Sequence, residues 1–104
     1  MKYINCAELK RGAKSGAKII DLRESVNFNS GHIPGALNIP PNEISKKTKK
    51  LCKNKNLILY CQTSGPTTRY AATVLKKIGF NNILILQYGY EGWLLEKELT
   101  KRAN

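Results

Sequence analysis

Short apolar runs alternate with amphipathic segments along the whole chain, and this alternation is the strongest constraint on its fold. The runs are predicted as strands at residues 1–4, 17–22, 36–39, 57–60 and 83–86. Between them apolar residues recur at helical spacing, most clearly over residues 67–78. The apolar face of that segment consists of Ala71, Ala72, Leu75 and Ile78. Short strands separated by helices are typical of a parallel sheet covered on both faces. The sequence therefore predicts an α/β fold.

Three further helices are predicted from capping residues and apolar spacing. The first is capped by Asn5, carries Cys6, Leu9 and Ala13 on one face, and ends at Gly12 or Gly16. The second opens at Asn42 and has its apolar positions at Ile44, Leu51 and Cys52. The last begins with Tyr90, Trp93 and Leu94 and runs into a basic tail. On this pattern Cys6 and Cys52 are expected to fill apolar positions of the core.

The charge balance restricts the class of ligand. The 104 residues include 18 Lys and Arg against 7 Asp and Glu, a net charge of +11, which favours small anions or acidic partners. No apolar run approaches the roughly 18 residues of a membrane-spanning helix, and residues 1–10 lack the apolar centre of a secretory signal. We therefore expect a soluble cytoplasmic domain with reduced cysteines. One histidine and three scattered cysteines offer no chelating spacing, so neither a metal nor a cofactor is expected.

Cys61 is the candidate nucleophile. It directly follows the apolar run at 57–60, and a polar stretch at 62–68 leads from it into the predicted helix. In a parallel α/β sheet, sites form at the carboxyl ends of the strands, where helix N-termini point into the crevice. The amides of a short loop there can converge on one anion, and a helix N-terminus favours the thiolate form of a cysteine. We therefore expect Cys61 to lie inside an anion-binding loop.

A nucleophilic thiol inside such a loop suits reactions in which sulfur attacks an anionic group. These reactions are the transfer of sulfane sulfur, the transfer of a phosphoryl group and the reduction of arsenate. The alternative interpretation is that Cys61 is a small buried side chain ending a strand, as free cysteines often are. Spacing alone does not select one of these reactions.

Five motifs, in order along nearly the whole chain, resemble the signature of the rhodanese family. They are Ile-Ile-Asp-Leu-Arg-Glu at 19–24, Gly-His-Ile-Pro-Gly-Ala-Leu-Asn-Ile-Pro at 31–40, Leu-Tyr-Cys at 59–61, Lys-Lys-Ile-Gly-Phe at 76–80 and Gly-Tyr-Glu-Gly-Trp at 89–93. The resemblance implies one rhodanese-like domain over residues 1–104. It also implies a five-stranded parallel sheet flanked by helices on both faces.

The same resemblance implies a thiosulfate sulfurtransferase-like enzyme. Cys61 would accept sulfane sulfur as a persulfide from a small anionic donor such as thiosulfate. It would then pass the sulfur to cyanide or to a thiol acceptor, either a small molecule or a protein. The outer sulfur would be held by the backbone amides of Gln62, Thr63, Ser64, Gly65, Thr67 and Thr68. Pro66 has no N–H and cannot contribute.

The loop departs from the family pattern in charge and in length. Common members carry an arginine inside the loop, whereas the first arginine here is Arg69, within the predicted helix. The loop is one residue longer, as in phosphatases and arsenate reductases of the same fold. Those enzymes need an arginine where this chain has Thr67, and they place a histidine where it has Tyr60. Sulfur transfer is therefore preferred, and the main alternative is a weakly catalytic or non-catalytic binding module that docks an acidic partner.

Other polar residues have more ordinary interpretations. Asp21 and Arg23 are expected to form a buried polar network, although Arg23 could, like Arg69, steer anions. His32 lies in a Gly-Pro turn and is expected to be structural. The six lysines between Lys46 and Lys55 are expected on the solvated faces of the helix that opens at Asn42. No aromatic residue interrupts them, so nucleic acid is not an expected partner.

Overall fold

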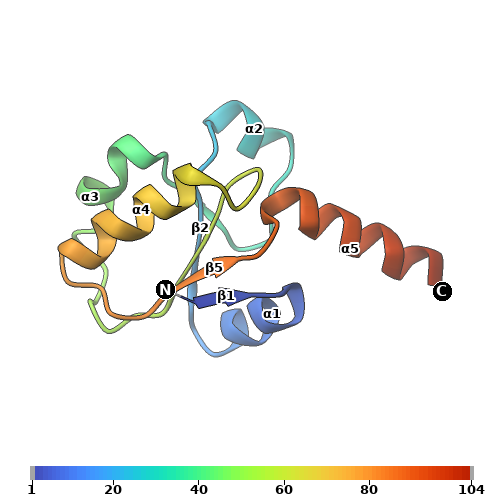
Figure 1. Ribbon diagram of the computed structural model, residues 1–104, viewed down its shortest axis with the longest axis horizontal. Coiled ribbons are helices and arrows are strands. Elements are labelled where there is room, and N and C mark those ends of the chain that lie inside the picture. The colour runs from blue at the N-terminus through green and yellow to red at the C-terminus, as the bar shows by residue number, and fades with distance from the viewer. Residues whose placement is uncertain (1, 104) are drawn as a thin grey trace.

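The computed structural model describes residues 2–103, which form a five-stranded parallel sheet with helices around it (Figure 1). The strands are β1 (Lys2–Ile4), β2 (Lys18–Asp21), β3 (Leu37–Asn38), β4 (Leu57–Tyr60) and β5 (Ile83–Leu86). Their order is β1-β5-β4-β2-β3, and every neighbouring pair is parallel. The predicted fold class is thus confirmed. Met1, included in the first predicted strand, lies outside the described residues.

Within the described residues, four α-helices connect these strands and a fifth follows β5. They are α1 (Cys6–Lys14), α2 (Ser25–Ser30), α3 (Ile44–Lys47), α4 (Pro66–Lys77) and α5 (Gly89–Ala103), and a short 3-10 turn, η1 (Pro41–Glu43), precedes α3. Asn5 caps α1 as predicted, because its side chain accepts the amide of Glu8 at 2.8 Å and the Glu8 side chain accepts the amide of Asn5 at 3.0 Å. The helix runs past Gly12 and ends before Gly16. None of these helices is long and apolar enough to cross a bilayer.

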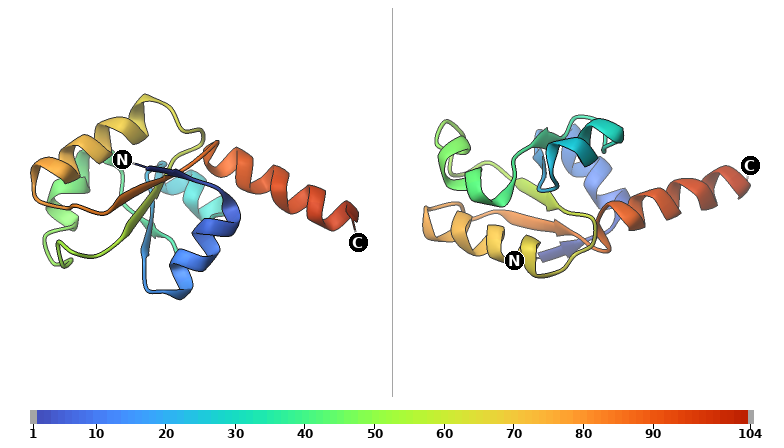
Figure 2. Two further views of the ribbon diagram at one scale, coloured as in Figure 1. Left: turned by 60° about the horizontal axis from the view of Figure 1, so that its bottom comes forward. Right: turned by 90° about the horizontal axis from the view of Figure 1, so that it is seen from above.

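Side chains of the central strand β4 alternate between two apolar clusters, one on each face of the sheet. Leu57 and Leu59 join the cluster beneath α3 and α4, whereas Ile58 and Tyr60 join the cluster beneath α1 and the first turns of α5. Figure 2 shows α1 and α4 on opposite sides of the sheet. Because both faces are covered, all four residues of β4 are buried. This explains why the strand is an uninterrupted apolar run in the sequence.

The helix predicted to open at Asn42 is much shorter than its apolar spacing suggested. The 3-10 turn leads directly into α3, which ends at Lys47 and is followed by turns. Thr48 is fully buried, and its hydroxyl donates to the carbonyl of Ile44 at 2.6 Å, a local bond that competes with continued helix. Leu51 still packs against the core from a turn, but Cys52 is exposed, so its predicted place in the core is wrong. The lysines therefore lie on turns as well as on α3, not along one helix.

Two features of the outer structure were not predicted from the sequence, namely the helix α2 and the direction of α5. Residues 25–30 form α2, which buries no side chain and leaves no apolar periodicity in the sequence. The last helix, α5, begins against the sheet and projects away from it (Figure 1, red). Its exposed large apolar side chains are Leu94, Leu95 and Leu99.

Candidate active site

Cys61 lies where the sequence placed it, at the carboxyl end of the central strand and one short loop before α4. Its side chain is half-buried and packs against the cluster on the α4 face of the sheet. The loop of residues 61–65 ends at Gly65, the N-cap residue of α4, and Pro66 occupies the first helical turn. No side chain among residues 2–103 caps this helix. The positive end of the α4 dipole is therefore presented next to the cysteine loop.

The first turn of α5 holds the cysteine loop in place. The amide of Tyr90 donates to the carbonyl of Cys61 at 2.9 Å, and the amide of Glu91 donates to the carbonyl of Gln62 at 3.1 Å. In a trans peptide the carbonyl and the following amide point in opposite directions. The amides of Gln62 and Thr63 therefore point away from α5. Two bonds from one helix thus orient two successive peptide units of the loop.

Five amides in and after this loop have no partner within the described part of the chain. The hydrogen bonds among residues 2–103 include none donated by the amides of Gln62, Thr63, Ser64, Gly65 or Thr67. The amide of Thr68, a predicted sulfur ligand, instead donates to the carbonyl of Gly65 at 3.2 Å within the first turn of α4. Backbone donors clustered at a helix N-terminus form an environment suited to an anion.

The side chain of Thr68 is fully buried, yet its hydroxyl finds no hydrogen-bond partner among the described residues. It does not cap α4, since that position belongs to Gly65. A buried hydroxyl without a partner costs roughly 1–3 kcal/mol. Thr68 therefore destabilises the free protein unless another molecule satisfies its hydroxyl.

Replacing Thr68 with valine should raise the free energy of unfolding by about 1 kcal/mol, because valine has the same branched shape without the polar group. Urea denaturation of both proteins would measure the change. Thr73→Val is the matched control on the same helix, since Thr73 is exposed and its hydroxyl bonds the carbonyl of Arg69 at 2.9 Å. The control should change stability by less than about 0.5 kcal/mol. Strong destabilisation by Thr68→Val would show that the hydroxyl does have a partner.

A buried ion pair lies beneath the cysteine loop. The guanidinium of Arg23 contacts the carboxylate of Asp21 at 2.9 Å, and the two side chains are almost completely buried. The same guanidinium donates to the carbonyl of Gly31 at 2.6 Å and to the side-chain oxygen of Gln62 at 3.4 Å. It also lies over the ring of Tyr90, 4.1 Å from the ring centre. Arg23 is therefore a link between loops, with its donors engaged by protein groups.

Tyr60 belongs to the same buried network. Burial, followed by the proximity of Asp21, raises the pKa of Tyr60 well above its ordinary value. Its hydroxyl is therefore neutral, and it accepts the amide of Ile33 at 3.1 Å. This bond attaches the turn after α2 to the end of β4, immediately before Cys61.

The remaining predicted residues lie outside this network. Arg69 is exposed, and its side chain forms no hydrogen bond or ion pair within residues 2–103. His32 is also exposed; its ring stacks on that of Phe28 at 3.7 Å between centres, and its Nδ1 lies 2.8 Å from the Phe28 carbonyl. His32 thus stabilises its own turn.

The described residues contain no group of three or more His, Cys, Asp or Glu arranged to hold a metal ion.

Sequence reasoning missed the part played by Gly89. This residue begins α5 with a φ of +59° and packs directly against the backbone of the cysteine loop. A Cβ atom at this position would lie 2.6 Å from the Cys61 carbonyl oxygen. The only trace in the sequence is the Gly-Tyr-Glu-Gly-Trp motif, which by itself says nothing about the loop that the glycine contacts.

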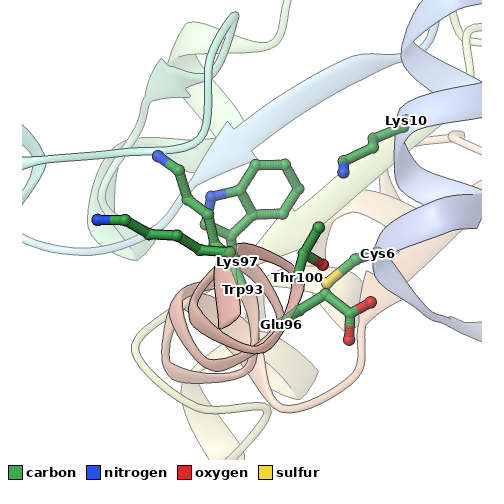
Figure 3. A pocket seen from close by; sticks show the side chains of 7 residues that line it. Cys6, Lys10, Trp93, Glu96, Lys97 and Thr100 are labelled. Atoms are coloured by element: carbon green, nitrogen blue, oxygen red, sulfur yellow. The ribbon is translucent and has the colours of Figure 1, made fainter. Parts of the chain in front are cut away.

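A cavity of about 340 Å³ lies between α1 and α5, and Cys61 is not among the residues that line it (Figure 3). In it, Cys6 and Lys10 from α1 face Trp93 and Glu96 from α5. Burial and the charge of Glu96 raise the pKa of the Cys6 thiol, an effect that the nearby Lys10 opposes. Cys6 is half-buried at this helix contact, and its environment favours the neutral thiol.

The fold and the loop together define a parallel α/β domain with a cysteine at the end of its central strand. The family description Rhodanese-like domain matches residues 5–96, and the chain belongs to this family. It is 37% identical over 93 residues to the uncharacterized protein YqhL of Bacillus subtilis, covering 89% of this chain and 72% of that protein. It is also 25% identical over 75 residues to the thiosulfate sulfurtransferase GlpE of Tolumonas auensis, covering 72% and 70% of the two chains.

Solved structures agree with this assignment. The human single-domain sulfurtransferase TSTD1 superposes with a TM-score of 0.80 at 25% identity, covering 90% of this chain and 96% of that one. Other curated relatives are longer than this chain, which spans 40% of one and 57% of another. The chain is therefore related to sulfurtransferases within a family that also contains larger proteins.

Proposed function

We propose that this protein is a sulfurtransferase that carries sulfane sulfur on Cys61, and that residues 1–104 act as one domain. The observation that carries the proposal is the group of unpaired backbone amides in the loop that follows Cys61. These amides lie beside a helix N-terminus that no side chain caps. Such a site stabilises negative charge on a sulfur atom. The relationship to GlpE and TSTD1 supports the same reaction class.

The reaction has two displacement steps. The thiolate of Cys61 attacks the outer sulfur of thiosulfate, forming a new S–S bond while the original S–S bond breaks and sulfite leaves with its electron pair. An acceptor thiolate, or cyanide, then attacks the outer sulfur of the Cys61 persulfide. The bond between the two persulfide sulfurs breaks, and the Cys61 thiolate is regenerated. The loop contributes by stabilising the negative charge of the donor and of the terminal sulfur.

The loop supplies this stabilisation through dipoles and not through a charged side chain. Residues 61–68 include no lysine or arginine, and the nearest following cation is the exposed Arg69. We propose that Arg69 and the basic surface raise the local concentration of anions at the loop, with an effect that weakens as salt is added. Arg23 would orient the loop through Gln62 and not bind the donor, because its donors are already engaged.

The direct test is the mass of the purified protein after exposure to thiosulfate. The wild type should gain one sulfur atom, about 32 Da, and Cys61→Ser should gain none, because serine cannot form a persulfide. Cys52→Ser is the control, since it removes an exposed thiol that the proposal does not use. Sulfur uptake by Cys61→Ser, or none by the wild type with thiosulfate and with other persulfide donors, would contradict the proposal.

The absence of a cation in residues 61–68 favours a second candidate, a rhodanese-like binding module with weak or no catalysis. The two candidates differ in turnover. An enzyme loaded with sulfur returns to its unmodified mass when a thiol acceptor or cyanide is added. A binding module retains the mass of the loaded form, or never acquires the sulfur.

A further inference from the structure

We infer that a groove beside β3 is a docking site for an acidic, extended polypeptide. The groove, called here the lysine groove, encloses about 640 Å³. It is lined by residues 37–39 of the sheet edge and by Lys46, Lys47, Lys49 and Lys50. It lies apart from the cysteine loop, and none of its residues belongs to the proposed sulfur site. The inference therefore stands independently of the proposed reaction.

The groove carries a concentrated positive charge that the protein itself leaves largely uncompensated. Lys47 pairs with Glu43 at 3.1 Å, and both side chains are partly exposed. Lys46, Lys49 and Lys50 have no carboxylate partner within the described residues and are exposed. Four ammonium groups at one groove attract carboxylates and repel cations, and the net charge of +11 reinforces this preference.

The edge strand that lines the groove carries an exposed apolar side chain. Leu37 is 43% exposed, although it belongs to the sheet. The strand β3 has β2 as its single neighbour within residues 2–103, so its other edge is unpaired. The amide of Ile39 donates to the carbonyl of Asp21 at 2.9 Å, and alternation along the strand turns the backbone of Asn38 outward.

Side-chain hydrogen bonds add to the backbone pairing that joins this edge to β2. The side chain of Asn38 donates to the carbonyls of Asp21 and Arg23 at 3.2 and 2.8 Å, which fixes β3 to the end of β2. An extended peptide can therefore pair its main chain with Asn38, place an apolar side chain on Leu37 and direct acidic side chains to the lysines. An edge already bonded to the sheet has less conformational freedom to lose on binding.

The same features favour a peptide over other polyanions. No aromatic side chain lines the groove, so unpaired bases would find no surface on which to stack. Leu37 is the one exposed apolar side chain among the lining residues, since Ile39 is buried, whereas insertion into a lipid surface requires several apolar groups that protrude beyond the cations. A polypeptide that combines carboxylates with a small number of apolar side chains matches both the lysines and Leu37.

The test is fluorescence anisotropy of a short labelled peptide in which Glu and Leu alternate. Binding should weaken about tenfold or more in the double variant Lys46→Glu, Lys50→Glu. The matched control is Lys97→Glu, Lys101→Glu, which makes the same charge change at the same spacing on the projecting helix α5 and should weaken binding less than about threefold. Replacing Leu in the peptide by Ser, or Leu37 by Ser in the protein, should also weaken binding several-fold.

Four results would overturn the inference. Equal losses in the two charge variants would mean that net charge alone attracts the peptide. A single-stranded oligonucleotide of equal charge could bind more tightly than the peptide and lose that binding in Lys46→Glu, Lys50→Glu, which would assign the groove to nucleic acid. The same result with vesicles of phosphatidylserine and phosphatidylcholine would assign it to a membrane surface. No peptide binding to the wild type at low salt would exclude the site. The two charge variants lower the net charge equally, so any slowing of sulfur uptake should be the same in both, whereas peptide binding should differ between them. Failure here is therefore distinguishable from failure of the sulfurtransferase proposal.

Discussion

Replacing Asp21 with alanine is expected to lower the free energy of unfolding by about 3–5 kcal/mol, because it leaves the charge of Arg23 buried without a counter-ion. Arg23 is 6% exposed and Asp21 is fully buried, so bulk water has little access to the guanidinium. The carboxylate also accepts the backbone amide of Arg23 at 2.8 Å, and that bond is lost as well. Domains of this size are typically stable by about 5–15 kcal/mol. The variant should therefore be marginally folded.

Urea denaturation of Asp21→Ala and of the double variant Asp21→Ala, Arg23→Met separates the two causes. If the unpaired charge dominates, removing it should restore most of the lost stability, since apolar replacement of a buried ion pair is often close to neutral. If the double variant is as unstable as the single one, the carboxylate acts mainly through the backbone bond and the ion-pair argument is wrong. The double variant also loses the contacts of Arg23 with Gly31 and Gln62. Any remaining deficit therefore combines the loss of these loop contacts with the loss of the bond from the Arg23 amide to the carboxylate.

The strands could be predicted because local composition and tertiary environment agree in them. Leu57–Tyr60 is apolar throughout since both faces of β4 are covered, and the sequence shows this directly. The prediction of a long helix from Asn42 was wrong because apolar spacing does not show whether a residue contacts the core from a helix or from a turn. Leu51 contacts the core from beyond the end of α3, and the buried hydroxyl of Thr48 bonds the carbonyl of Ile44 where the helix stops.

The place of Cys61 could be predicted for a similar reason, since a strand followed by a polar loop and a helix is a local pattern. The support of its loop could not be predicted. The bonds from Tyr90 and Glu91 join the loop to a helix far along the chain, and no local pattern specifies them. The unpaired hydroxyl of Thr68 is equally invisible in the sequence, because a threonine in a helix gives no sign of its hydrogen-bond partner.

The support of the cysteine loop can be tested at Gly89, where alanine is expected to disrupt both the fold and the proposed reaction. The added Cβ would lie 2.6 Å from the carbonyl oxygen of Cys61, 2.8 Å from that of Gln62 and 2.8 Å from the Cα of Thr63. These atoms all belong to the backbone, so relief requires the loop or α5 to move. Together with the cost of a left-handed φ of +59°, overpacking should destabilise the protein by about 2–5 kcal/mol.

The rate of sulfur uptake by Gly89→Ala should fall about a hundredfold, because a shift of about 1 Å at a reacting group has an effect of that order. Gly35→Ala is the matched control, since Gly35 has a φ of +84° but no atom within 4 Å of an added Cβ. The control carries only the conformational cost of about 1–2 kcal/mol and should take up sulfur at the normal rate. Thermal unfolding and the timed gain of mass from thiosulfate give the two measurements. If Gly89→Ala behaves like Gly35→Ala in both, the contact between α5 and the loop does not set the geometry of Cys61.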